Sequence, residues 1–396
     1  METASRRHPT AVMPELEEHR TETVIVGAGP AGLAVAACLR RRGRQFVLLE
    51  RERSVGASWR GHYDRLHLHT DRRHSTLPFF SFPKGTPRYP SRLQVLAYLE
   101  AYAARFGVDP RFGEPVTAAR RRQGWEVETP AARYRAAHLV VASGVNALPH
   151  RPGWSGLEGF RGRLIHSSEY RNGEPFRDRE VLVVGLGNSG GEIAIDLFEH
   201  GARPTLAVRG PVNVIPRELL GIPILTWSIA LGTLPLAVAD ALSAPLLRAA
   251  MGNLESLGLR RPPFGPGAQV VRRARIPLID VGTLELVRRG AVAIRGGITR
   301  FTPGGVIFDD GREGSYDAVV LATGFRPSVA EFLEGADRVL GPEGRPLASG
   351  REAALPGLYF CGFFVSPTGM LREIAREARR IARHISRRPL ARRGVA

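Results

Sequence analysis

The first regular pattern along the chain is a short apolar run, a glycine-rich turn and a stretch rich in alanine and leucine. Thr23–Val26 predicts a strand, Leu33–Arg42 predicts a helix, and Gly43 ends that helix. A second apolar run, Phe46–Leu49, predicts another strand, which closes on Glu50. Strand, turn, helix and strand in this order predict one βαβ unit.

The same alternation of apolar strand, glycine turn and helix returns in the middle of the chain. Val181–Val184 predicts a strand, Glu192–Glu199 a helix, and Thr205–Val208 a second strand that closes on Arg209. The two units lie 158 residues apart, counted between their first glycines. The chain therefore repeats one dinucleotide-binding pattern.

Three more apolar runs end in glycine turns: Leu139–Ala142 before Ser143-Gly144, Ala318–Ala322 before Thr323-Gly324, and Leu358–Cys361 before Gly362. We interpret the first two as crossing points between two nucleotide-binding domains. The chain then predicts a long helix, Leu371–Arg387, with one apolar stripe and one basic face. A helix of this kind is expected to dock its apolar stripe on the protein.

These elements predict an α/β fold with two Rossmann-like domains, the second inserted into the first. We expect residues 1–20 to be a disordered tail, because they are polar and lack an apolar run. The first domain would comprise residues 21–163 and 325–396, and the second residues 164–324. Residues 211–275 are too long for a simple loop and too apolar for a linker, so they predict a helical insertion that covers the cleft.

Both glycine turns have the physical features that a pyrophosphate site requires. The first glycine allows the tight turn, the second lets backbone approach phosphate, and the third lets helix and strand pack closely. The helix that follows offers free N–H groups and the positive end of its dipole. The residues concerned are Gly27, Ala28, Gly29, Pro30, Ala31 and Gly32 in the first turn, and Gly185, Leu186, Gly187, Asn188, Ser189 and Gly190 in the second.

The residue that closes the second strand of each unit distinguishes the two nucleotides. Glu50 follows Gly27 by 23 residues, and a carboxylate there accepts hydrogen bonds from both ribose hydroxyls, which suits FAD. Arg209 follows Gly185 by 24 residues, and a guanidinium pairs with a 2′-phosphate that a carboxylate would repel. The first unit is therefore predicted to bind FAD and the second NADPH, which implies hydride transfer between them.

Composition adds few alternatives to this picture. The net charge is +18, but the arginines are scattered and do not interleave with aromatic residues, so we expect no nucleic-acid binding. Anionic cofactors account for part of the positive charge. The two cysteines, Cys38 and Cys361, form no Cys-x-x-Cys pair, which argues against a dithiol flavoreductase, and we expect no metal site.

One segment raises the question of membrane contact. Gly221–Ala239 is a run of 19 residues without a charge, but prolines and a glycine interrupt it. We expect a buried or surface-lying helical insertion, with contact to a membrane surface as the alternative. The N-terminal residues lack the apolar core of a signal peptide, so a cytoplasmic location is expected. The sequence does not predict an oligomeric state.

A further motif links the chain to a known family. Phe160, Gly162, His166 and Tyr170 form a Phe-x-Gly-x-x-x-His-x-x-x-Tyr pattern that resembles the signature of flavin-containing monooxygenases. From Thr23 to Ile385 the chain is similar to the plant YUCCA group of indole-3-pyruvate monooxygenases. The similar segments are Tyr63–His69, Tyr89–Ser91, Tyr98–Glu100, Val208–Glu218, Pro277–Leu284 and Leu321–Arg326.

The resemblance also implies roles for individual residues. Trp59 and Arg60 would contact FAD, although Trp59 could instead be ordinary core, and Gly362 would lie near the flavin. Ser143, Gly144, Thr323 and Gly324 would approach the cofactors through their backbone. Arg326 would contact NADPH or only join the domains, and His166 would serve as a hinge and cofactor-orienting residue. The chain departs from the group at residues 70–74 and 364–368, where the substrate pocket could differ.

For the reaction, the resemblance implies that NADPH reduces FAD and that oxygen adds at the flavin C4a to form a (hydro)peroxide. Attack on an aromatic α-keto acid such as indole-3-pyruvate would release carbon dioxide and give indole-3-acetate. Arg65 and Arg217 are candidates for binding the substrate carboxylate. One alternative is oxygenation of an amine or sulfide at nitrogen or sulfur. Another is a flavin-binding, membrane-associated protein without turnover.

Overall fold

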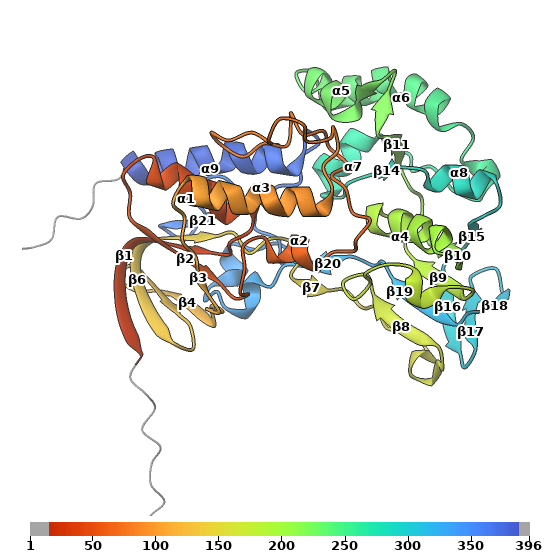
Figure 1. Ribbon diagram of the computed structural model, residues 1–396, viewed down its shortest axis with the longest axis horizontal. Helices are drawn as coiled ribbons and strands as arrows, with labels where there is room; N and C mark the ends of the chain where they lie inside the picture. The colour runs from red at the N-terminus through yellow and green to blue at the C-terminus, as the bar shows by residue number, and fades with distance from the viewer. Residues whose placement is uncertain (1–15, 388–396) are drawn as a thin grey trace, which may run out of the picture.

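The computed structural model describes residues 16–387, which form two α/β units side by side (Figure 1). The first unit holds a seven-stranded sheet in the order β3-β2-β1-β6-β5-β4, with β21 paired to β6. The pairs of β1 with β2 and with β6 are parallel, as a βαβ unit requires. Its strands are β1 (Glu17–Val26), β2 (Phe46–Glu50), β3 (Arg111–Phe112), β4 (Ala118–Arg121), β5 (Trp125–Glu128), β6 (Ala132–Val141) and β21 (Leu358–Phe360).

Helices cover one face of this first sheet. Apolar side chains of α1 (Pro30–Arg40), α3 (Arg92–Arg105) and α9 (Met370–Arg387) share one core with Ile25 of β1 and Val140 of β6. The apolar stripe predicted for the terminal helix is buried against α1, and its arginines face outward, as expected. A short helix, α2 (Ala57–Gly61), follows β2.

The second unit is a five-stranded parallel sheet in the order β15-β10-β9-β19-β8. Its strands are β8 (Arg163–His166), β9 (Glu180–Val184), β10 (Arg203–Ala207), β15 (Ala293–Arg295) and β19 (Ala318–Leu321). The helices α4 (Asn188–Glu199) and α8 (Thr283–Arg288) cover one face, and a small antiparallel sheet covers the other. That sheet consists of β16 (Ile298–Thr302), β17 (Gly305–Phe308) and β18 (Glu313–Ser315).

The insertion projects from the second unit at the edge of the molecule (Figure 1). It is mainly helical, as predicted, with α5 (Ile224–Leu231), α6 (Leu236–Met251) and α7 (Pro266–Arg273). It also holds short strands that the sequence analysis did not expect: β11 (Val214–Pro216), which pairs with β14 (Leu278–Asp280), and a hairpin of β12 (Glu218–Leu219) and β13 (Ile222–Pro223). Between residues 16 and 387, no helix combines the length and apolarity needed to cross a bilayer.

Two predicted boundaries were wrong. Residues 17–20, assigned to a disordered tail, form the start of β1 and pair with Ala132–Arg135 of β6, so backbone hydrogen bonds order them despite their polar side chains. Residues 1–15 lie outside the described part. Residues 154–163, assigned to the first domain, pack on the second, because Trp154 and Phe160 bury their rings against Phe301.

The two units are joined where crossing points were expected. Strand β7 (Leu148–Pro149) pairs antiparallel with β20 (Phe325–Arg326), so both connecting segments run side by side. Ser143-Gly144 and Thr323-Gly324 lie just before these two strands. Both cysteines are buried and free. The described residues contain no group of three or more histidine, cysteine or acidic side chains that could hold a metal.

Candidate active site

The first glycine turn lies between β1 and α1 and has the shape of a phosphate cradle. Gly27 has φ +103°, and a Cβ there would lie 2.8 Å from the Ala142 carbonyl oxygen. A Cβ on Gly32 would lie 1.9 Å from the Gly27 carbonyl oxygen, so helix and turn meet without room for a side chain. A Cβ on Gly29 would meet nothing within 4 Å. The middle glycine therefore faces open space, where a pyrophosphate can approach the backbone.

The second turn repeats these features between β9 and α4. Gly185 has φ +107°, and a Cβ on Gly190 would lie 1.9 Å from the Gly185 carbonyl oxygen. Gly187 again faces open space. Neither α1 nor α4 has a side-chain N-cap or an acidic residue in its first turn. The free N–H groups at both helix ends are thus available to an anion.

Glu50 closes β2 beside the first turn. Its carboxylate is buried and accepts a hydrogen bond from the Ala28 backbone N–H at 2.6 Å and another from Glu52 at 3.0 Å. These bonds fix the carboxylate at the end of the strand, where a ribose hydroxyl would meet it. The FAD assignment of the first turn is compatible with this geometry.

Arg209 lies two residues beyond the end of β10 and is exposed. In the described part of the chain its guanidinium has no hydrogen bond or ion pair, so its charge is free for a ligand. Arg260, from the insertion, donates a hydrogen bond from Nη2 to the Arg209 carbonyl oxygen at 3.2 Å and also lacks an acidic partner. Sequence reasoning missed Arg260, because the fold of the insertion brings it to this place. Two guanidinium groups without acidic partners thus lie beside one turn, which is compatible with the NADPH assignment of that turn.

The crossing segments place one unpartnered polar atom beside the first turn. The Ser143 hydroxyl oxygen is buried and has no hydrogen-bond partner in the structure. Its backbone contacts Gly27, since a Cβ on that glycine would lie 3.2 Å from the Ser143 Cα. A buried hydroxyl without a partner is costly, and a polar cofactor group would satisfy it. The predicted contact of Ser143 was one of its backbone, and the orphaned hydroxyl is an additional polar group at the same place.

The histidine of the monooxygenase-like motif contacts the segment that connects the two units. His166 is buried on β8, and its Nε2 donates to the Gly324 carbonyl oxygen at 3.0 Å. Its Nδ1 accepts the Ser168 backbone N–H at 3.1 Å, so the ring is a neutral imidazole with a fixed tautomer. Burial lowers its pKa below the ordinary histidine value. His166 therefore holds the crossing segment in place, in agreement with a hinge role.

Three other residues that were predicted to contact a cofactor have partners within the protein. Arg60 pairs with Glu100 at 2.6 Å on the surface, and Trp59 packs partly buried against the core of the first unit. Thr323 donates its hydroxyl to the His150 carbonyl oxygen. Arg326 lies in β20 and is exposed. Arg60, Trp59 and Thr323 thus have contacts within the protein, and the cofactor roles of all four residues remain predictions.

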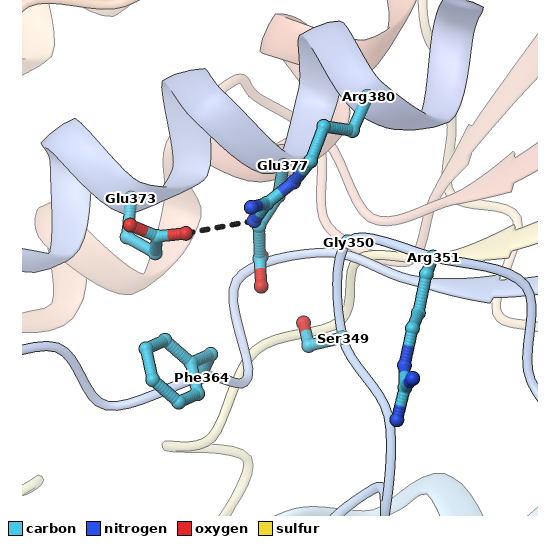
Figure 2. Close-up of a pocket in the computed structure, with 7 residues that line it drawn as sticks. All are labelled: Ser349, Gly350, Arg351, Phe364, Glu373, Glu377 and Arg380. Carbon is cyan, nitrogen blue, oxygen red and sulfur yellow. Dashed lines mark hydrogen bonds and ion pairs between the residues drawn. The ribbon is translucent and has the colours of Figure 1, made fainter. Parts of the chain in front are cut away.

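Gly362 reaches the first turn from the opposite end of the chain. It has φ +85°, and a Cβ there would lie 3.0 Å from the Ala31 Cβ of α1. Its N–H donates to the buried Glu377 Oε2 at 2.6 Å, and burial raises the Glu377 pKa. Figure 2 shows this carboxyl group above Ser349, in a cavity of about 300 Å³ under α9. Glu377 thus positions the loop that approaches the first turn.

A cavity of about 410 Å³ lies where the first unit, α4 and the insertion meet. Its lining residues come from all three parts: Arg65, His67, His69, Pro87, Arg88, Tyr89, Glu192, Arg217 and Val281. Both predicted carboxylate-binding arginines belong to this set, so the structure brings together residues 152 positions apart in the sequence. The cavity is rich in cationic side chains and has an aromatic ring on one wall.

The two predicted arginines differ in availability. Arg65 forms an ion pair with Glu199, and the neighbouring Arg88 pairs with Glu218. Arg217 stacks its guanidinium 4.2 Å from the centre of the Tyr89 ring and has no acidic partner in the described residues. A stacked, unpaired guanidinium is preoriented for a planar carboxylate. Arg217 is therefore the better candidate of the two.

Comparisons with known proteins agree with this architecture. A family model described as pyridine nucleotide-disulphide oxidoreductase matches residues 24–217. The chain is 43% identical to indole-3-pyruvate monooxygenase YUCCA1 of Oryza sativa subsp. japonica, covering 81% of this chain and 80% of that protein. It is 40% identical to a probable indole-3-pyruvate monooxygenase, YUCCA1, of Arabidopsis thaliana, with 86% and 84% covered.

Among solved structures, the fold is similar to a flavin-containing monooxygenase from Stenotrophomonas maltophilia. The TM-score is 0.70 at 25% identity, with 92% of this chain and 98% of that one covered. Both cysteines here are buried and belong to no Cys-x-x-Cys pair. The match to the pyridine nucleotide-disulphide oxidoreductase model therefore concerns the nucleotide-binding framework and not a pair of reactive thiols. The similarities cover most of each chain and so concern the whole architecture.

Proposed function

The chain belongs to the family of the flavin-dependent indole-3-pyruvate monooxygenases, and from this premise we propose that it decarboxylates an aromatic α-keto acid oxidatively with FAD, NADPH and O2. The reaction converts indole-3-pyruvate, O2, NADPH and a proton into indole-3-acetate, carbon dioxide, water and NADP⁺. FAD and NADPH supply oxygen activation and the hydride when bound. The residues of the chain must bind and orient these partners and keep water out.

FAD is assigned to the first glycine turn. The free N–H groups at the start of α1 would hold its pyrophosphate, and the Glu50 carboxylate its ribose. Ser143 would give its unpartnered hydroxyl to the same cofactor. Gly362, held by Glu377, would border it from the C-terminal side. Trp59 and Arg60 remain proposed contacts at its rim.

NADPH is assigned to the second glycine turn. The start of α4 would hold the pyrophosphate, and Arg209 the 2′-phosphate. Arg260 would add a second guanidinium to the same phosphate. His166 donates a hydrogen bond to the Gly324 carbonyl oxygen and so holds one of the segments that connect the two units. This would keep the two nucleotide sites in a fixed relative orientation.

The substrate is assigned to the cavity of about 410 Å³. Arg217 would bind the carboxylate of the keto acid, and the Tyr89 ring behind it keeps the guanidinium in place. Outside the residues that line this cavity, helix α5 packs on two loops, because Thr226 lies 3.2 Å from the His74 ring and Leu225 packs at Gly369.

The unpaired Arg217 in the interdomain cavity is the observation that favours a carboxylate substrate. The test is a turnover assay of the FAD-loaded protein with NADPH and labelled indole-3-pyruvate. Labelled carbon dioxide released in step with NADPH oxidation is expected. Product formed only from amines or sulfides would favour N- or S-oxygenation instead, and no turnover with any substrate would favour a non-catalytic flavin-binding protein. A cytoplasmic location remains part of this proposal.

A further inference from the structure

The insertion carries a concentration of exposed apolar side chains. Eight of the fourteen large apolar residues that are exposed in the described part of the chain lie between residues 220 and 276: Leu220, Ile222, Leu234, Val238, Leu242, Leu246, Val271 and Ile276. Scattered single apolar residues are normal on a protein surface, but a contiguous group marks an interaction site. Three of the eight, Ile222, Leu234 and Val238, lie in the uncharged run Gly221–Ala239.

Helix α6 shows the clearest pattern. Val238, Leu242 and Leu246 are four residues apart and are 44%, 58% and 48% exposed. Residues at this spacing lie on one side of a helix. Leu234, which precedes the helix, is also exposed, at 40%. The outer side of α6 thus presents an unpartnered apolar stripe.

The inner side of the helix pair is occupied. Leu225 of α5 is buried, and α5 contacts the loops around His74 and Gly369. Asp240 of α6 accepts two backbone N–H bonds from the first turn of α7, both at 2.9 Å. Figure 1 shows α5 and α6 at the outer edge of the molecule. The exposed stripe therefore belongs to a fixed, outward-facing surface of the folded insertion.

The charges around this surface indicate which kind of partner it would bind. Residues 219–276 contain six arginines and two acidic residues, a net charge of +4. Both acids are engaged, Asp240 by the α7 backbone and Glu255 by Arg261. The remaining arginines, such as Arg272 and Arg275 on the exposed part around α7, have no acidic partner among the described residues. An apolar stripe with flanking cations fits an anionic lipid surface.

We propose that the outer face of the insertion, with the apolar stripe of α6 and the adjacent arginines, docks on an anionic membrane surface. The described helices are too short and too polar to cross it, so the contact is peripheral. A second copy of the chain fits less well, because a symmetric contact would bring the same arginines against each other. The proposal does not depend on the reaction.

The test is flotation of the full-length, FAD-loaded protein with vesicles. We expect binding to phosphatidylcholine vesicles with about one third phosphatidylglycerol, weaker binding to pure phosphatidylcholine, and release by salt. The double variant Leu242→Glu/Leu246→Glu should lose at least about tenfold in vesicle affinity with an unchanged flavin content. Arg272→Gln/Arg275→Gln should weaken binding to the anionic vesicles alone. Leu347→Glu, at a residue that is 67% exposed outside the insertion, is the matched control.

Two results would overturn the proposal. One is equal binding of wild type and the Leu242→Glu/Leu246→Glu variant, or no binding of either to anionic vesicles. The other is a dimer of the wild type in light scattering that this variant converts to a monomer, which would assign the stripe to a second copy. Flavin absorbance and the melting temperature show that each variant is folded.

Discussion

The Glu192 carboxylate of α4 pairs with the His69 imidazole of the first unit, across the boundary between the two domains. Glu192 is 4% exposed, and the nearly buried Tyr63 ring lies against it and Ser189. Burial is the main cause that raises the Tyr63 pKa well above its ordinary value, so this hydroxyl stays protonated. The helix that would bind NADPH is thus anchored to the segment that lines the substrate cavity.

This contact predicts a loss of stability on removal of the carboxylate. Glu192→Ala leaves His69 and Tyr63 without their buried acceptor, so the free energy of unfolding should fall by about 2 kcal/mol or more. Glu199→Ala, which breaks the more exposed pair with Arg65, should cost less than about 1 kcal/mol. Urea denaturation of the FAD-loaded protein measures both. Equal effects of the two substitutions would contradict an anchoring role for Glu192.

The second prediction concerns nucleotide selectivity. Arg209→Ala should raise the Kd for 2′,5′-ADP by about 10- to 100-fold, because one charge-assisted hydrogen bond to the phosphate is lost. Arg260→Ala should also raise the Kd for 2′,5′-ADP, but by a smaller factor. Affinity for 5′-AMP, which lacks the 2′-phosphate, should not change. Isothermal titration measures all four values without turnover.

Arg261→Ala is the control for Arg260. It is the next residue in the chain, but it pairs with Glu255 and donates to the Gly252 carbonyl oxygen. Its removal should leave the affinity for 2′,5′-ADP unchanged. A loss as large as that of Arg260→Ala would mean that general charge, and not the position beside Arg209, determines phosphate binding.

The third prediction tests the substrate assignment. Arg217→Ala should raise KM for indole-3-pyruvate by about 10- to 100-fold, since a stacked guanidinium no longer pairs with the carboxylate. Arg88→Ala, on the same cavity wall but paired with Glu218, should change KM much less. Steady-state kinetics with saturating NADPH gives both values. Unchanged KM in Arg217→Ala would place the carboxylate elsewhere.

The βαβ units and the Glu50 and Arg209 positions were predictable because a pyrophosphate turn constrains neighbouring residues. Helices α1 and α4 begin three and four residues earlier than predicted, at Pro30 and Asn188, because the turn runs directly into the first helical turn. A local pattern of glycines and strand ends is enough to identify such a site. The strands β9 and β19 were predicted for the same reason.

Contacts between distant residues were not predictable from local pattern. Glu192 and His69 are 123 residues apart, and Arg260 and Arg209 are 51 apart. Only the docking of the insertion and of the two units brings these groups together. For Arg60, the family resemblance implies a cofactor contact, and the pairing with Glu100, 40 residues away, could not be read from the local sequence. The early start of β1 was missed because pairing with β6 orders residues 17–20 without an apolar run.

The fourth prediction concerns Gly187 and Gly190 of the second glycine turn, whose substitution by alanine should have different effects. Gly187→Ala should leave the melting temperature and FAD content unchanged, because its Cβ would enter open space. The same methyl group should obstruct the approach of a phosphate and weaken NADPH binding by at least about tenfold. Gly190→Ala should instead destabilise the fold, since its Cβ would lie 1.9 Å from a backbone oxygen. Thermal melting and NADP⁺ titration distinguish these results.

The last prediction is a pH dependence from His166. Its pKa is lowered by burial, so the unfolded chain takes up a proton near the ordinary histidine value while the folded chain remains neutral. The stability contributed by the neutral ring is complete above that ordinary value and is lost as the pH falls below it toward the lowered pKa. His62, whose pKa burial also lowers, acts in the same direction.

We therefore expect the free energy of unfolding to fall between about pH 7.5 and pH 5.5, and the fall to be smaller in His166→Asn. Asparagine cannot be protonated, and its amide can still donate to the Gly324 carbonyl oxygen. Chemical denaturation of the FAD-loaded protein at several pH values measures the slope. A slope in His166→Asn equal to that of the wild type would show that the buried ring does not resist protonation.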